Sequence, residues 1–243
     1  MKKTILLTLI GGSMLMSCNS AKKISEGDGD FKYTVEQFAD LQVLRYKVPG
    51  FEELNLKQKE LIYYLTQAAL EGRDILFDQN GKYNLTIRKM LEEVYTNYKG
   101  DKKDTNYINM EVYLKRVWFS NGIHHHYSSD KFLPAFSQEF FRSELAKLDP
   151  AKLPLKKGET LDQLCNEIFP VMFDPRIMPK RVNQADGQDL VETSASNYYE
   201  GVTQQEAEDF YGAMKNPNDT MPVMFGMNSR LVKENGKIYE KVW

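Results

Sequence analysis

The stretch Asn228-Ser-Arg-Leu-Val-Lys-Glu-Asn-Gly-Lys-Ile-Tyr-Glu-Lys-Val-Trp243 decides the fold class of this chain of 243 residues. Two alternating segments, Asn228–Lys233 and Lys237–Trp243, flank Asn235-Gly236. Asn-Gly between such segments predicts a β-hairpin, because its type I′ turn needs positive φ at both central residues. The preceding chain is mainly helical in pattern, so the sequence predicts an α+β fold.

Helical patterns fill most of the chain before the hairpin. Asn55 and Gln58 form a capping box, and apolar residues from Leu61 to Ile75 follow at helical spacing, which predicts one long helix ending near Asp78–Gly81. Further helices are expected from an Asn84 cap to about Tyr95, from Met110 to Ser120 with Gly122 as its stop, from Ser137 to about Leu148, from Thr160 to Pro170, and from Thr203 to before Pro217.

Two other segments carry strand signals. Leu190–Tyr199 contains β-forming residues in alternation, which predicts a strand. Phe31–Tyr46 mixes alternating and helical spacing and leaves both structures open. The last predicted strand runs to Trp243 without a turn or cap, and a two-stranded hairpin is marginal alone, so we expect further strands to follow in a parent protein.

The first 30 residues have the pattern of an export signal and a tether. Lys2 and Lys3 precede an apolar run, Thr4–Met16, that is too short to span a membrane. The run leads into Leu15-Met16-Ser17-Cys18, which looks like a bacterial lipobox. We therefore expect residues 1–17 to be a signal peptide, Cys18 to be acylated, and 18–30 to be a flexible tether. The mature protein would be exported and held on a bacterial membrane, although a secretory signal with an incidental cysteine is the alternative.

Composition excludes several classes of protein. The net charge of −2 gives no basic excess for binding nucleic acid, while a hydrophobic content of 42% is enough for a sizeable core. If Cys18 is acylated, Cys165 has no cysteine with which to form a disulfide, and its helical apolar spacing favours a buried structural thiol. The sequence contains no P-loop, GxGxxG or GxSxG motif.

The histidines are unusual in their placement, because all three, His124, His125 and His126, are adjacent. The zinc motif HExxH needs two histidines one helical turn apart with a glutamate between them, so this chain cannot form it. Adjacent side chains point in different directions and rarely converge on one ion. We therefore expect no catalytic residue and no metal site here, and a loop or cleft-wall role for the cluster.

The sequence around the histidines, Val117-Trp-Phe-Ser-Asn-Gly-Ile-His-His-His-Tyr127, resembles the N-terminal region of dipeptidyl peptidase III in its bacterial, Bacteroides-like form. The resemblance covers about Phe31–Trp243 in the same order. The other matching segments are Leu44–Phe51, Leu56–Leu65, Asp130–Phe132, Ser196–Thr203 and Asn228–Lys233.

The resemblance implies a two-lobed zinc exopeptidase that removes dipeptides from the N-termini of short peptides. Its lower lobe has helices packed around a small antiparallel β-barrel, and its upper lobe carries the zinc motifs. Peptide binds in the cleft as an added strand. Residues 31–243 resemble the lower lobe alone, with part of the barrel. By this resemblance, zinc is bound by the full-length family protein and not by this chain. The partner that this chain lacks is the C-terminal catalytic lobe. The chain alone is therefore expected to be inactive.

The resemblance also implies a site. Tyr127 matches an aromatic residue that lines the peptide cleft, and stacking on a substrate side chain suits it. Asn121 and His126 flank the same loop and are candidate substrate contacts. The alternatives are a non-catalytic, membrane-tethered peptide-binding module and a decayed gene product. An incomplete barrel also predicts exposed strand edges.

Overall fold

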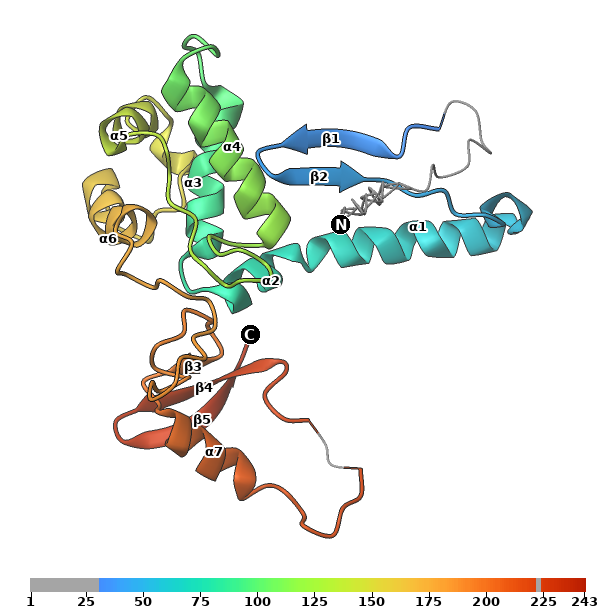
Figure 1. Ribbon diagram of the computed structural model, residues 1–243, viewed down its shortest axis with the longest axis vertical. Coiled ribbons are helices and arrows are strands. Elements are labelled where there is room, and N and C mark those ends of the chain that lie inside the picture. The colour runs from blue at the N-terminus through green and yellow to red at the C-terminus, as the bar shows by residue number, and fades with distance from the viewer. Residues whose placement is uncertain (1–30, 222–223) are drawn as a thin grey trace, which may run out of the picture. The chain divides into compact units, whose positions relative to one another are not determined.

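The structure is a computed structural model that describes residues 31–221 and 224–243, and it has the predicted α+β class (Figure 1). The signal peptide, the acylated Cys18 and the tether predicted for residues 1–30 lie outside the described residues. The chain divides into one unit up to Lys47 and a second unit, Val48–Trp243. No helix among the described residues is both long and apolar enough to cross a membrane.

The described part of the first unit is a β-hairpin. Strands β1 (Thr34–Phe38) and β2 (Leu41–Leu44) pair antiparallel, and Ala39 in the turn has a φ of 47°. The ambiguous spacing of Phe31–Tyr46 therefore resolves as two strands. Most side chains of both strands are exposed, as expected for a two-stranded ribbon.

The second unit begins with a layer of helices. Helix α3 packs against α2, α4 and α5, and α5 packs against α6 (Figure 1). The helical elements, in chain order, are η1 (Phe51–Glu53), α1 (Leu56–Glu71), α2 (Arg73–Asn80), α3 (Asn84–Asn97), α4 (Thr105–Ser120), α5 (Gln138–Leu145), η2 (Pro150–Lys152), α6 (Leu161–Phe173) and α7 (Gln204–Gly212).

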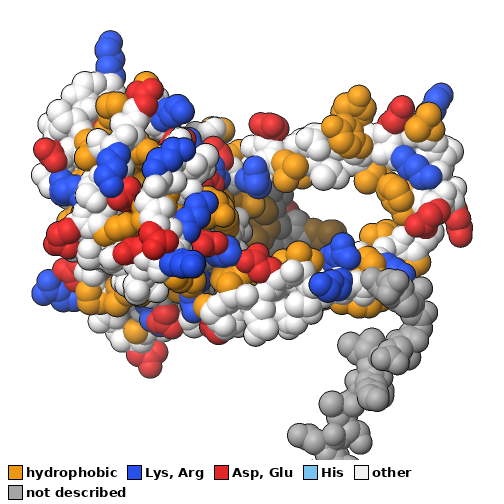
Figure 2. Space-filling view, turned by 90° about the horizontal axis from the view of Figure 1, so that it is seen from above, with side chains coloured by type: hydrophobic (Ala, Val, Ile, Leu, Met, Phe, Trp, Pro, Cys, Tyr) orange, Lys and Arg blue, Asp and Glu red, His pale blue; other side chains and the backbone are white. Residues whose placement is uncertain are grey.

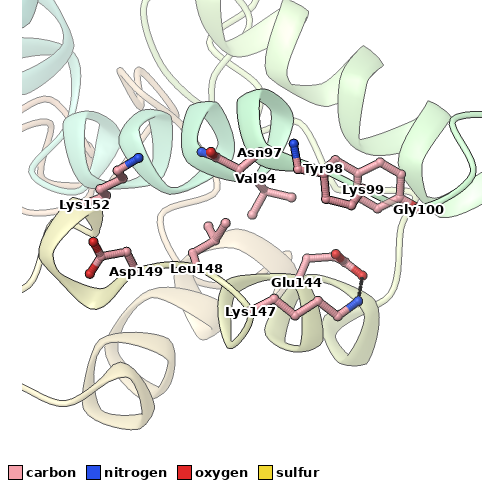
Figure 3. Close-up of a pocket in the computed structure, with 10 residues that line it drawn as sticks. All are labelled: Val94, Asn97, Tyr98, Lys99, Gly100, Glu144, Lys147, Leu148, Asp149 and Lys152. Carbon is pink, nitrogen blue, oxygen red and sulfur yellow. Dashed lines mark hydrogen bonds and ion pairs between the residues drawn. The ribbon is translucent and has the colours of Figure 1, made fainter.

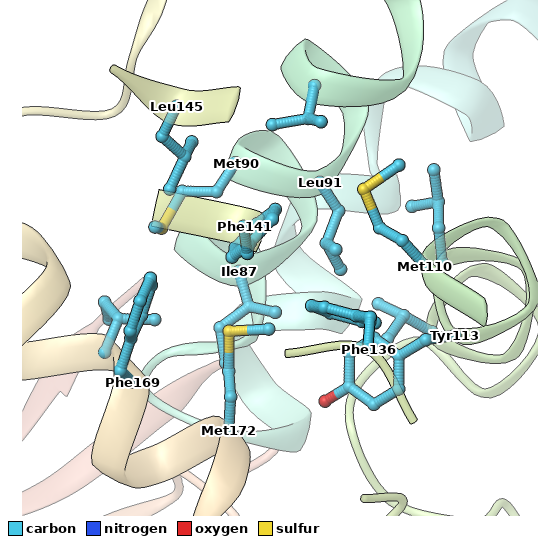
Figure 4. Packing of buried hydrophobic residues seen from close by; sticks show 14 of the residues in the cluster. Ile87, Met90, Leu91, Met110, Tyr113, Phe136, Phe141, Leu145, Phe169 and Met172 are labelled. Atoms are coloured by element: carbon cyan, nitrogen blue, oxygen red, sulfur yellow. The ribbon is translucent and has the colours of Figure 1, made fainter. Parts of the chain in front are cut away.

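The main core lies between α3, α4, α5 and α6, where their apolar faces meet (Figure 4). Ile87, Leu91, Leu114, Phe141 and Met172 are fully buried. Burying a side chain of this size contributes about 1.5–3 kcal/mol relative to leaving it exposed. Cys165 is also buried in this core, as the sequence predicted, and burial raises the pKa of its thiol.

The predicted helix starts are confirmed where a side chain caps them. Asn55 with Gln58, Thr160 with Gln163, and Thr203 with Glu206 form complete capping boxes. The Ser137 side chain accepts a hydrogen bond from the Phe140 N–H at the start of α5. These caps form within one helical turn, so they depend little on the rest of the fold.

The single long helix predicted after Asn55 is wrong, because two helices span this segment. It is divided at Gly72 into α1 and α2, and none of the residues of α1 is buried. Leu61, Tyr64 and Leu65, which recur at helical spacing, are more than half exposed. The spacing of apolar residues identified the helix but not the exposure of its side chains.

Two further helix boundaries differ from the prediction. Helix α4 begins at Thr105 rather than at Met110, because the Asp104 carboxylate accepts hydrogen bonds from the N–H groups of Asn106 and Tyr107. Helix α6 continues through Pro170 to Phe173. Proline does not end this helix, which is packed into the core on both sides of it.

The predicted strand Leu190–Tyr199 is largely wrong, since only β3 (Tyr199–Glu200) is a strand. The Asp189 carboxylate accepts hydrogen bonds from the N–H groups of Val191 and Glu192. The Thr193 hydroxyl donates back to the Asp189 carbonyl. These local side-chain bonds hold the segment in turns and compete with strand pairing.

The predicted C-terminal hairpin is confirmed. Strands β4 (Ser229–Glu234) and β5 (Lys237–Val242) pair in antiparallel register, and Asn235 and Gly236 have φ of 52° and 76°. Strand β3 pairs with β4 in parallel, so the sheet is mixed and not the purely antiparallel one expected. Within residues 31–221 and 224–243, no set of strands closes into a barrel.

A smaller core joins α7 to this sheet through Val202, Ala207 and Leu231. Lys, Arg, Asp and Glu side chains are interspersed on the face that Figure 2 shows, without a large block of one sign. This mixture agrees with the net charge of −2.

Candidate functional site: the loop after helix α4

The loop 121–132 starts from a close contact with α3. Asn121 ends α4 in the left-handed conformation, with a φ of 51°, where the sequence predicted Gly122 as the stop. Gly122 is needed for a different reason: a Cβ at this position would lie 2.3 Å from Asn84 Nδ2. The Asn84 Oδ1 accepts a hydrogen bond from the Ile123 N–H at 3.2 Å. Asn84 is therefore a buried support of the loop, and its predicted role as the cap of α3 is wrong, since Tyr83 holds that position.

The loop then closes on itself through main-chain hydrogen bonds. The His125 N–H donates to the Asp130 carbonyl at 2.7 Å, and the Ser129 N–H donates to the His125 carbonyl at 3.1 Å. Nearer the base of the loop, the Phe132 N–H donates to the Ile123 carbonyl at 2.8 Å. These bonds hold residues 125–130 as a short closed tip.

A second segment, residues 178–181, fastens the loop from the other side. The Lys131 N–H donates to the Pro179 carbonyl at 3.1 Å, and the Arg181 N–H donates to the Ser129 carbonyl at 2.9 Å. The Lys180 ammonium forms an ion pair with the Asp130 carboxylate, and this contact lowers the pKa of that carboxyl group. The loop 121–132 and the segment 178–181, about 50 positions apart in the sequence, are thus held together.

The Lys131 side chain fastens the loop 121–132 to the end of α6. Its ammonium donates to the carbonyls of Val171 at 2.9 Å, of Ile177 at 2.6 Å, and of Asp174. The carbonyls at a helix C-terminus carry partial negative charge, so an ammonium group is a suitable partner. Burial lowers the pKa of Lys131.

His124 is a structural residue. Its side chain is buried, with 2% of the residue exposed, and its Nε2 lies 2.8 Å from the Met178 carbonyl oxygen. Because a carbonyl can only accept, Nε2 carries the proton and Nδ1 does not. Burial lowers the pKa of His124 to about 4, so the imidazole is neutral near pH 7.

His125 and His126 support the tip of the loop. The His125 Nδ1 accepts hydrogen bonds from the N–H groups of Tyr127 and Ser128, each at 3.1 Å. The two imidazole rings stack with centroids 4.5 Å apart, and the His126 ring meets the edge of Phe119 at 5.1 Å. Burial lowers the pKa of His126.

The three histidines do not converge as a set of three zinc ligands. His124 Nε2 is committed to a carbonyl, its Nδ1 is buried, and His125 Nδ1 is committed to two N–H groups. No group of three or more His, Cys, Asp or Glu side chains in the described part of the chain is placed to hold a metal.

Tyr127 projects from the tip. It is 85% exposed, and its ring contacts the His126 ring at 4.3 Å. Asn121 lies at the base of the loop, where its carbonyl accepts a hydrogen bond from Asn80 Nδ2 at 3.1 Å. The structure therefore brings the three predicted site residues onto one braced loop, with Tyr127 the most accessible.

Sequence reasoning missed three residues that fix the loop. These are Asn84, Lys131 and Arg181, whose guanidinium donates to the His126 carbonyl at 3.1 Å. Their partners lie 39 to 55 positions away, and no local pattern marks such contacts.

Comparison with known proteins adds no assignment. No protein family matches the chain, and no curated protein matches it.

Proposed function

We propose that residues 31–243 form the N-terminal, peptide-binding lobe of a zinc-dependent dipeptidyl peptidase similar to dipeptidyl peptidase III. The observation that carries this proposal is Tyr127, an aromatic side chain that is 85% exposed on a loop whose backbone is braced on both sides. An exposed aromatic ring on a preorganised loop can bind a partner with little loss of conformational entropy. Short peptides are the proposed ligands.

The other two site residues have distinct roles in this proposal. His126 positions the Tyr127 ring, because its Nδ1 is buried and its own ring is packed between Phe119 and His125. The Asn121 side chain has no hydrogen-bond partner among the described residues, so its amide is free to bind a peptide main chain. Tyr127 would pack on a substrate side chain.

The mixed sheet offers a second support. Strand β5 pairs with β4 along one edge, and no described strand pairs with its other edge. Such an edge can accept another strand, either from a peptide or from the remainder of a barrel. In our proposal this sheet is part of the lower-lobe barrel that the family resemblance implies.

Catalysis would require a further lobe. His124 and His125 make structural hydrogen bonds and the His126 ring packs against Phe119 and His125, so in this proposal zinc and the residues that hold it would come from sequence outside these 243 residues. The chain alone is expected to bind peptide without hydrolysing it. In the cell it would be exported and anchored through Cys18, near peptides outside the cytoplasm.

A binding measurement tests the site. The whole chain, purified in detergent, would be titrated with an unblocked tetrapeptide by calorimetry. Tyr127→Ala is expected to weaken binding about threefold to tenfold, the loss of one aromatic contact. Tyr127→Phe should retain most of the affinity, and Tyr46→Ala, at another exposed tyrosine, should change nothing. Equal affinity of the Tyr127→Ala variant would refute the role of this loop.

A second experiment tests the enzyme class. The coding DNA after the Trp243 codon would be sequenced in the source organism. An open frame that continues into HExxGH would support the peptidase lobe. A stop codon at that position would leave the non-catalytic, membrane-tethered peptide-binding module, which the calorimetry would then test.

A further inference from the structure

Charged side chains of opposite sign lie next to one another in the cavity beside the end of α3. The cavity has a volume of about 470 Å³ and lies between the end of α3 and the segment from α5 to η2 (Figure 3). Lys147 pairs with Glu144 at 2.6 Å, and Lys152 lies beside Asp149 (Figure 3). Because these lysines have carboxylates next to them, the cavity wall does not single out an anionic ligand. Helix α1 carries a surface with a clearer preference.

Helix α1 presents an apolar stripe to solvent. None of its 16 residues is buried. Successive residues of a helix are turned by about 100°, so Leu61 and Leu65 lie on one side, with Ile62 and Tyr64 flanking them. Leu61, Tyr64 and Leu65 are each more than half exposed. A contiguous exposed apolar surface of this kind marks an interaction site.

The stripe has the spacing of a seam between two helices. If Gln58 and Leu65 take heptad position a, Leu61 and Ala68 take position d. In an antiparallel pair related by a two-fold axis, a positions face d positions. Leu65 then faces the partner's Leu61, and the small side chain of Ala68 leaves room for the partner's Gln58. One helix face is thus complementary to a second copy of itself.

Two charges beside the stripe favour the antiparallel orientation. Lys57 and Glu71 are both exposed and take position g, two heptads apart, on the same side as Tyr64. Neither makes an ion pair with another described residue. A two-fold axis near Tyr64 places Lys57 of each copy opposite the partner's Glu71, whereas a parallel pair would place like charges opposite one another.

The same two charges are unfavourable in an isolated helix. Lys57 lies in the first turn of α1 and Glu71 in the last, with no acidic residue in the first turn and no basic residue in the last. A helix dipole favours the reverse arrangement, anions at the N-terminus and cations at the C-terminus. In an antiparallel pair, Lys57 lies beside the C-terminus of the partner helix, and Glu71 lies beside its N-terminus. A second copy therefore offsets the unfavourable placement.

We infer that α1 is a self-association surface, on which two copies of this chain pair their α1 helices antiparallel about a two-fold axis near Tyr64. Leu61 and Leu65 form the seam, and Lys57 pairs with the partner's Glu71 at both ends. The inference rests on α1 alone and does not require the proposed peptidase function.

Exchange of the two charges tests the pairing. Sedimentation equilibrium of the whole chain in density-matched detergent at low salt gives the dimer dissociation constant. Lys57→Glu and Glu71→Lys should each weaken the dimer about threefold to tenfold, because two attractive pairs become repulsive. The double variant Lys57→Glu/Glu71→Lys should regain at least the wild-type affinity. Glu60→Lys, at an exposed position outside the seam, should associate like the wild type.

A matched pair of leucine variants tests the seam. Leu65→Ala should weaken the dimer about tenfold or more, because both copies lose the contact, whereas Leu56→Ala, on the opposite side of α1 and 71% exposed, should leave it unchanged. A wild-type chain that stays monomeric at its highest soluble concentration, or a double charge variant as weak as the single variants, would overturn the inference. Protection of α1 from amide hydrogen exchange in such a monomer would assign its cover to the same chain.

Discussion

His124 Nε2 donates a hydrogen bond to the Met178 carbonyl oxygen at 2.8 Å, inside a buried contact between the loop after α4 and the segment before Arg181. The bond exists only for an imidazole protonated on Nε2, and its Nδ1 is buried without a partner among the described residues. Protonation of Nδ1 would place an uncompensated charge in this contact. The junction is therefore built around a neutral histidine.

This arrangement predicts a loss of stability in mild acid. The pKa of His124 is lowered to about 4 in the folded chain, from an ordinary value of 6.5. Between these values the unfolded chain binds more protons, so the free energy of unfolding decreases as the pH falls from about 6.5 to about 4. The full loss is about 3 kcal/mol. Urea denaturation at pH 7.0 and at pH 4.5 measures most of it.

The His124→Gln variant is the control for this pH effect. An amide side chain can donate to the Met178 carbonyl without titrating. Its free energy of unfolding should fall less between pH 7.0 and 4.5 than that of the wild type. Keeping above pH 4.5 avoids the region where protonation of Asp130 and Asp174, whose pKa values are lowered by their ion pairs, also costs stability. An identical pH dependence in both proteins would contradict the assignment.

Substitutions of Asn84 and Gly122 should have coupled effects on the free energy of unfolding. Gly122→Ala places a Cβ 2.3 Å from Asn84 Nδ2 at a φ of 151°, so it should cost about 1–3 kcal/mol through overpacking and backbone strain. Asn84→Ala should cost about 1–3 kcal/mol, because the Ile123 N–H loses its acceptor. In the double variant the clash is gone, so the total cost should be less than the sum. Strict additivity in chemical denaturation would refute the coupling.

Removal of the Lys131 ammonium group should lower the free energy of unfolding. Lys131→Met removes the donor to the carbonyls of Val171, Asp174 and Ile177 and should cost about 1–3 kcal/mol of unfolding free energy. Amide hydrogen exchange should speed up most in residues 174–181, which this lysine fastens. Lys103→Met, at an exposed lysine, serves as the matched control. Equal stability of the two variants would show that the ammonium contributes little.

The capping boxes at Asn55, Thr160 and Thr203 and the turn at Asn235-Gly236 could be predicted from sequence, because each involves residues within one helical turn or one tight turn. The structure of Leu190–Tyr199 could not be predicted from local sequence in the same way. A single carboxylate, that of Asp189, redirects the backbone there, and alternation of apolar residues does not record it.

The candidate site was predictable only in part. The adjacent histidines mark the loop in the sequence, but its rigidity comes from distant partners such as Asn84 and Lys131. The cavity beside α3 was not predicted at all. It depends on how α3 ends at Tyr98 and on where η2 packs, and both are settled by tertiary structure.

Helix α1 gives the last prediction, because its periodicity identified a helix whose apolar face is exposed. Leu61 and Leu65 are each more than half exposed, whereas Leu91 in α3 is fully buried. Leu61→Ser/Leu65→Ser should therefore change the free energy of unfolding by about 1 kcal/mol at most, while Leu91→Ala should cost about 2–5 kcal/mol. The α1 double variant should also associate less in light scattering, because an exposed apolar patch promotes contact between molecules. A large loss of stability in the α1 variant would show that this face is packed in the folded protein.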